Sequence, residues 1–237
     1  MSGHSKWNSI KRQKGISDSK RSAVFTKYAN NIVIAAKNGS DPESNFSLRM
    51  AVDKAKKENM PKDSIEKAIK RGSGELGGAA AEELIYEGFG PSNTQFIVKC
   101  LTDNKNRSVA NIRHIFAKHG GSLGAVSWNF EQKGVIKILN AELNQNNFEE
   151  LELTLIDCGA LDIIKDEELT TIFTKIENLQ SVNKLLEEQN IKTESAEIEY
   201  IARETIDLPE EKQEKIISFE EALDGNEDVA DYYSNIK

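Results

Sequence analysis

The sequence predicts an α+β protein of several domains: an N-terminal helical domain and two α/β domains with ferredoxin-like antiparallel sheets, the third inserted into the second. Three observations support this. The first part of the chain has helical apolar spacing, residues 134–204 follow the order β-α-β-β-α-β, and further strand patterns flank this block on both sides. The expected domains are residues 1–75, residues 76–133 with 205–237, and residues 134–204.

Three helices are expected in the first domain. From Ser22 to Lys37, apolar residues recur every three or four positions. A second helix is expected to start at Asp41-Pro42-Glu43, because proline suits the first helical position and acidic residues suit the first turn. The third follows the break at Met60-Pro61 and stops at Gly72. The glycine-rich residues 71–83 then indicate a linker, since no phosphate-loop lysine follows.

Strand and helix patterns alternate through the rest of the chain. For the second domain we expect strands at residues 83–87 and 94–101, a helix at 104–119, a strand around residues 127–130, an acidic helix at 210–223 and a strand at 228–236. For the third domain we expect strands at residues 134–139, 161–166, 168–176 and 193–202, with helices at 147–159 and 177–190.

Charge is divided unevenly along the chain. The net charge is -8, but residues 1–73 hold 16 Lys and Arg against 7 Asp and Glu, and the remaining residues hold 15 against 32. The chain as a whole is acidic, but phosphates respond to the local field. The basic N-terminal part therefore predicts a nucleic-acid partner. The alternative is that lysine-rich helices only solvate their outer faces.

Membrane and secreted proteins are not indicated. The longest apolar run, Ile32 to Ala36, is too short to span a bilayer, and no apolar segment follows the basic N-terminus. We therefore expect a cytoplasmic protein without a membrane partner. Cys100 and Cys158 lack metal-binding spacing and are expected to be small core residues.

Motifs for catalysis are missing from the sequence. His114 and His119 lie five positions apart, so they occupy different faces of one helix and do not form a helical zinc pair. A position at the helix C-terminus explains His119 through the helix dipole. Neither GxSxG, HExxH nor GxGxxG occurs. We expect no enzyme, no metal, no cofactor and no small-molecule substrate.

The best candidate for binding nucleic acid is the segment GHSKWNSIKRQKGISDSKR, residues 3–21. Its small polar residues, Ser5 among them, let the backbone approach phosphates, and Trp7 can stack on a base. The cations of this segment are Lys6, Lys11, Arg12, Lys14, Lys20 and Arg21. Further cations that extend the candidate surface are Lys62, Lys67, Lys70 and Arg71 on the third helix and Lys105, Arg107, Arg113 and Lys118 on a later one. The alternative is a tail whose Trp7 packs on the helical domain.

Several long motifs resemble one known family. GHSKWNSIK, NMPKDSIEKAIKRG, YEGFGP, LTDNKNRSVANIRHIFAKHGGSLG and VSWNFEQKGVI are closely similar to the YebC/PmpR family, which includes the mitochondrial translational activator of cytochrome c oxidase subunit I. The likeness is dense over residues 3–136 and implies the same three-domain fold. Residues that match the family's motifs include Gly3, His4, Ser5, Lys6, Trp7, Lys20, Arg21, Lys27, Lys62, Lys70, Arg71, Asn106 and Arg107.

The resemblance implies a DNA-binding regulator of transcription, or else a translation factor that binds messenger or ribosomal RNA at the ribosome. A third alternative is a non-catalytic scaffold that uses the acidic region to hold a partner protein. Two departures from the family pattern are present: the loop at Ala125 is short, and Asn129 stands where methionine is common. Contacts that this loop makes in other members are therefore not carried over.

Overall fold

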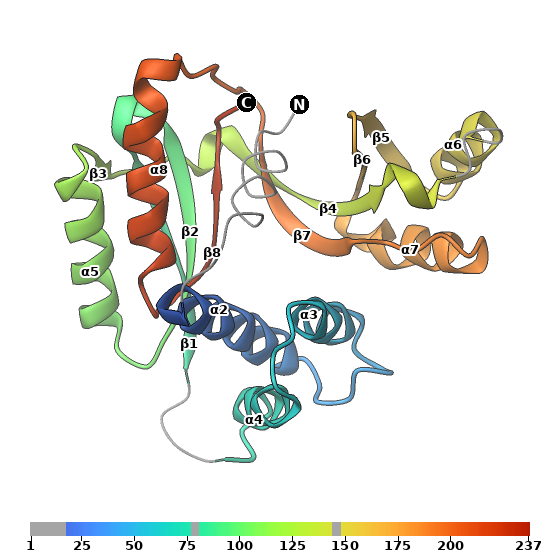
Figure 1. The fold of residues 1–237 in the computed structure, drawn as a ribbon, viewed down its shortest axis with the longest axis horizontal. Helices are drawn as coiled ribbons and strands as arrows, with labels where there is room; N and C mark the ends of the chain where they lie inside the picture. The colour runs from blue at the N-terminus through green and yellow to red at the C-terminus, as the bar shows by residue number, and fades with distance from the viewer. Residues whose placement is uncertain (1–17, 77–80, 144–147) are drawn as a thin grey trace. The chain divides into compact units, whose positions relative to one another are not determined.

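The structure, a computed structural model, describes residues 18–76, 81–143 and 148–237 (Figure 1). Its packing separates two compact units. One contains residues 18–131 with Ile201–Lys237, and the other, called the inserted unit below, is Gln132–Tyr200. Each unit holds one four-stranded antiparallel sheet with helices, and the first also holds the N-terminal helices. The predicted α+β architecture, with an inserted α/β part, is confirmed.

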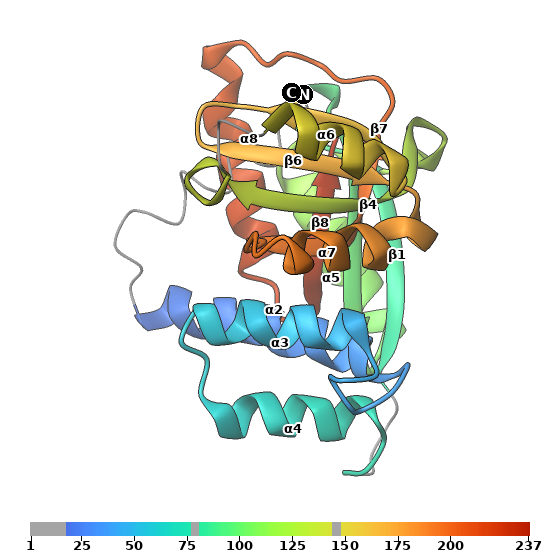
Figure 2. The same ribbon diagram turned by 90° about the vertical axis from the view of Figure 1, so that its right-hand side faces the viewer.

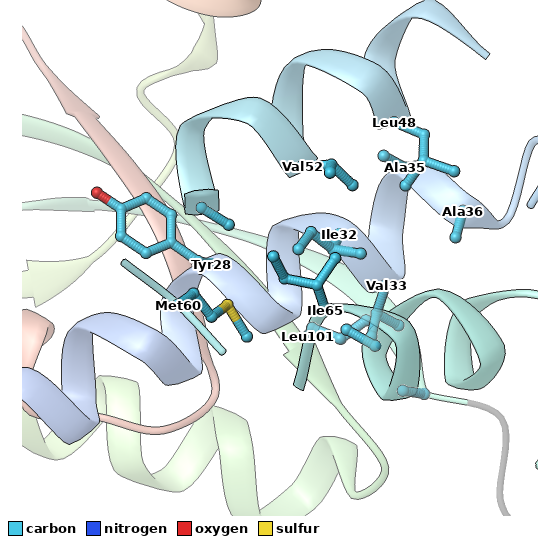
Figure 3. Packing of buried hydrophobic residues seen from close by; sticks show 13 residues of the cluster. Tyr28, Ile32, Val33, Ala35, Ala36, Leu48, Val52, Met60, Ile65 and Leu101 are labelled. Atoms are coloured by element: carbon cyan, nitrogen blue, oxygen red, sulfur yellow. The ribbon is translucent and has the colours of Figure 1, made fainter. Parts of the chain in front are cut away.

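Within the described residues, three helices form the helical lobe. Their bounds are α2 Asp18–Ala36, α3 Phe46–Lys57 and α4 Lys62–Gly72. The apolar faces of these helices meet in one core, where Ile32, Leu48 and Ile65 are almost fully buried (Figure 3). Leu101 joins this core from the neighbouring sheet. The apolar spacing of the sequence therefore located the helices and the side that each one buries.

The start of α3 differs from the prediction. Asp41 does not begin a helix, since its carboxylate instead accepts hydrogen bonds from the Glu43 amide at 3.1 Å and the Ser44 hydroxyl at 3.2 Å, which fixes a turn. Asn45 is the actual cap and accepts from the Leu48 amide at 3.1 Å. Its amide also donates to the carbonyl of Ala35 at 2.8 Å. This buried side chain therefore joins the end of α2 to the start of α3.

The first sheet has the strand order β3-β1-β2-β8. Helices α5 and α8 pack on one of its faces, where Phe116 and Phe219 meet edge to face with ring centroids 4.9 Å apart. The elements are β1 Glu82–Phe89, β2 Gln95–Thr102, α5 Lys105–Lys118, β3 Ser122–Leu123, α8 Glu210–Asp224 and β8 Val229–Ser234. The strand expected around residues 127–130 is wrong in part: Ser127–Asn129 is a 3-10 turn, η2, and the next strand starts at Phe130.

In the second sheet the strand order is β5-β6-β4-β7. This is the ferredoxin-like order that the β-α-β-β-α-β pattern predicts. The elements are β4 Phe130–Leu139, α6 Phe148–Asp157, β5 Ala160–Lys165, β6 Leu169–Thr174, α7 Leu179–Glu188 and β7 Ser195–Ala202. The chain enters the inserted unit along β4 and leaves it along β7, which are neighbours in this sheet.

Polar contacts join the helical lobe to the first sheet. The Asn30 amide donates to the carbonyl of Glu227 at 2.9 Å, and Lys37 donates to the carbonyl of Ala81 at 2.6 Å. Lys27 forms an ion pair with Asp224 at 2.5 Å. Together with the shared apolar core, these contacts make the lobe and the first sheet parts of a single compact unit. Among the described residues, none of the helices combines the length and apolarity needed to cross a membrane.

Candidate nucleic-acid interface

Most of the predicted N-terminal contacts cannot be placed. His4, Ser5, Lys6, Trp7, Lys11, Arg12 and Lys14 lie outside the described residues. Lys20 and Arg21 belong to α2, in a stretch where the backbone alone is described. The remaining five predicted residues, Lys27, Lys62, Lys70, Arg71 and Arg107, have described side chains.

One face of α4 carries three exposed cations. Lys67, Lys70 and Arg71 are spaced three and four positions apart, so they share a side of the helix, and all three are exposed. Within the described part of the chain, no hydrogen bond or ion pair joins these three side chains to a carboxylate. We call them the α4 basic face. Lys62 differs, because it forms an exposed ion pair with Glu66 at 3.6 Å.

The position of the α4 basic face is fixed by close packing of α4 on α2. A Cβ added to Gly72 would lie 2.5 Å from the carbonyl oxygen of Val33 and 2.6 Å from the Cβ of Ala36. Only glycine therefore permits this approach of the last turn of α4 to α2. Both ribbon views show α4 packed as part of the lobe rather than projecting from it (Figure 2). The three cations are held on a rigid element.

Lys27 joins two parts of the molecule. Besides its ion pair with Asp224, its ammonium lies over the Tyr232 ring, 4.8 Å from the centroid. Its side chain is only 19% exposed. Lys27 thus links the helical lobe to α8 and β8, and any phosphate contact at this residue requires displacement of Asp224.

Arg107 is also engaged within the molecule. Its guanidinium donates to Asp103 at 2.9 Å and to Asp228 at 3.3 Å. The hydrogen bond to Asp103 and the charge of Asp228 raise the pKa of Arg107 above its ordinary value. Neighbouring Lys105 pairs with Glu82 at 2.6 Å. The cations at the start of α5 are therefore matched by nearby carboxylates, unlike those of the α4 basic face.

Lys67 belongs with Lys70 and Arg71, although it was not among the residues carried over from the family resemblance. Its spacing from Lys70 and Arg71 was the signal available in the sequence. Trp128 gave no such signal, because its segment was interpreted as a strand. In the structure Trp128 is one of the most exposed large apolar side chains among the described residues.

The histidines and cysteines have structural surroundings. The His119 ring packs against Phe219 at 5.7 Å between centroids, and burial, followed by the charge of Lys118, lowers the pKa of His119. The lowered pKa favours the neutral form of the ring. Cys100 is buried in the core as predicted, and burial raises its pKa to about 12. Cys158 is partly exposed, so its assignment to the core is wrong.

Across the described residues, no group of three His, Cys, Asp or Glu side chains could hold a metal ion.

Two family models match nearly the whole chain. The model of the TACO1/YebC protein N-terminal domain matches residues 5–75, and the model of the TACO1/YebC second and third domain matches residues 81–236. The chain belongs to the TACO1/YebC family. This assignment confirms the resemblance found in the sequence motifs.

Several similar proteins align over most of their lengths. A probable transcriptional regulatory protein of Thermoanaerobacter pseudethanolicus is 45% identical over 241 residues, covering 100% of this chain and 97% of the relative. One from Persephonella marina is 45% identical, covering 100% of this chain and 96% of the relative. The crystal structure of a conserved hypothetical protein from Aquifex aeolicus superposes with a TM-score of 0.80 at 39% identity, covering 93% of this chain and 91% of that one.

Proposed function

We propose that this TACO1/YebC protein is a non-catalytic, nucleic-acid-binding regulator of gene expression that acts on transcription by binding DNA. The α4 basic face is the observation that carries the proposal: three exposed cations without described carboxylate partners, on a rigid helix of an acidic protein. The names of the relatives, probable transcriptional regulatory proteins, support the same class.

In this proposal the α4 basic face positions the protein on a phosphate backbone. Lys67, Lys70 and Arg71 neutralise phosphates, and the release of counterions supplies much of the binding free energy. The N-terminal residues His4 to Lys14, with Lys20, Arg21 and Lys62, extend the contact. Residues 1–75 act as the binding domain in a three-domain chain. A cytoplasmic location goes with this role.

Removal of the three charges tests the proposal. We compare K67Q/K70Q/R71Q with K175Q/K184Q/K212Q, which removes the same charge from exposed lysines elsewhere. Fluorescence anisotropy measures binding to a labelled DNA duplex between about 50 and 200 mM salt. The first variant should bind more weakly to every sequence, and the slope of log K against log salt should fall by about three. Equal behaviour of the two variants, or binding independent of salt, would overturn the proposal.

The choice between DNA and RNA needs a separate measurement. Phosphate contacts carry no sequence information, so the same face also suits ribosomal RNA. Lysate is sedimented with and without dissociation of ribosomes, and immobilised promoter fragments are tested in parallel. Retention on promoter fragments with no protein in the ribosomal fractions supports the role in transcription. Comigration of the protein with ribosomal particles would contradict the role in transcription and support a role in translation.

A further inference from the structure

Trp128 projects from the η2 turn at the start of β4. Its side chain is 59% exposed, which is unusual for the largest apolar residue. A single exposed apolar residue needs no explanation by itself. The turn that presents Trp128, however, is held on both sides by hydrogen bonds from other segments.

Glu87 of β1 holds the residues before Trp128. Its Oε2 accepts hydrogen bonds from the backbone amides of Val126 and Ser127, each at 2.8 Å. Burial acts to raise the pKa of Glu87, but these amide hydrogen bonds outweigh it and lower the pKa below its ordinary value. The ionised carboxylate thus caps the turn.

Asn129, the residue after Trp128, is held by hydrogen bonds of its own side chain. Asn129 is buried, and its side-chain amide donates to Oε1 of Gln95 at 2.7 Å and to the carbonyl of Glu204 at 2.9 Å. Its Oδ1 accepts from the Glu204 amide at 2.8 Å. With both neighbours fixed, the backbone of Trp128 has little freedom left to lose when the indole meets a ligand.

An exposed cation lies beside the turn. The backbone amide of Arg203 donates to the carbonyl of Asn129 at 2.7 Å, so Arg203 is directly across from the residue after Trp128. Its side chain is 61% exposed, and its contact with Glu131 is long, 3.8 Å. Exposed pairs of this kind contribute little to stability, so the guanidinium is available at small cost.

We propose that Trp128 and Arg203 form a stacking subsite for one unpaired nucleotide, in which the indole stacks on the base and the guanidinium contacts the adjacent phosphate. Aromatic platforms with a nearby cation are the usual means of holding single strands. This inference rests on the proposed function, since it takes nucleic acid as the ligand. The adjacent cation favours a nucleotide over an apolar protein surface.

Affinity measurements separate the subsite from the α4 basic face. W128A, W128F and R203Q are compared with L153A, which removes another exposed apolar side chain, from the inserted unit. The probes are a labelled 20-nucleotide single strand, as DNA and as RNA, and the matching DNA duplex. W128A should weaken single-strand binding about tenfold and leave duplex binding unchanged. W128F should retain most of the affinity, and R203Q should reduce the salt slope by about one.

Fluorine NMR reports directly on the indole. The chain has two tryptophans, so full-length protein labelled with 5-fluorotryptophan gives two resonances, and W128F identifies that of Trp128. Saturation with the single strand should shift the Trp128 resonance through the ring current of the stacked base. An unchanged resonance at saturation, or equal affinities for W128A and L153A, overturns the subsite while leaving the proposed function intact. Absence of binding to every probe overturns both.

Discussion

Gly72 is the residue on which the placement of the α4 basic face depends. Glycine inside a helix normally costs up to about 1 kcal/mol relative to alanine. Here G72A should instead destabilise the protein by about 1–3 kcal/mol, because the new Cβ meets the Val33 carbonyl and Ala36 and forces the helices apart.

Urea denaturation of G72A, with G225A as its control, measures this effect. At Gly225 an added Cβ would lie 3.4 Å from its nearest neighbour, an ordinary contact distance. G225A should therefore be close to neutral. If G72A proves as stable as the parent chain, the close packing of α4 on α2 is wrong.

Glu87 should make stability depend on pH. Its pKa is lowered in the folded state, so its stabilisation is present above the unfolded value near 4.5 and is lost as pH falls through the folded pKa. E87Q should be less stable than the parent at pH 7 and should lose less stability on acidification. Thermal denaturation from pH 7 to pH 3 measures the difference, with exposed Glu167→Gln as control. Parallel curves for E87Q and the parent would contradict the capping role.

The surroundings of the individual candidate residues were the hardest feature to derive from the sequence. Lys27 and Arg107 match family motifs. Asp103, which pairs with Arg107, lies four positions away, but Asp224, which pairs with Lys27, and Asp228, which also pairs with Arg107, are distant in sequence. No local pattern reveals such partners. Lys70 could be recognised as exposed because helical spacing alone places it opposite Ile65 and Ala68.

At the scale of elements, periodicity predicted helices and strands better than their ends. The order of the inserted sheet followed from the alternation of strand and helix patterns. The start of α3 was missed because Asp41 and Asn45 are both good capping residues, and the bond from Asn45 to Ala35 decides between them. The η2 turn was missed because Trp128 and Phe130 have strand-like side chains.

Asn129 should be essential to the η2 turn. N129M, which restores the residue common in the family, leaves the Glu204 backbone amide and carbonyl and the Gln95 side chain without these partners. Unsatisfied buried groups cost about 1–3 kcal/mol each, so we expect a loss of at least about 2 kcal/mol in urea denaturation. Exposed Asn111→Met is the control and should be nearly neutral. Equal stability of the two variants would show that methionine repacks the site.

For the whole molecule, the two compact units predict two unfolding transitions. The inserted unit has its own buried residues, Leu155 and Ile172 among them, whereas Phe219 belongs to the core of the first sheet. In calorimetry of the full chain, L155A should lower the midpoint temperature of one transition and F219A that of the other. A single transition that both variants shift equally would show that the units unfold together.

Asn129 and Glu204 also bring together the two places where the chain leaves and rejoins the first unit. The two ends of the inserted unit are therefore held next to each other by hydrogen bonds between Asn129 and Glu204, which lie outside that unit. In evolutionary terms, a sequence that lengthens, diverges or is replaced between residues 132 and 200 leaves the connectivity of the first sheet unchanged. The basic lobe and its sheet can thus keep their fold when the inserted unit differs in length or sequence.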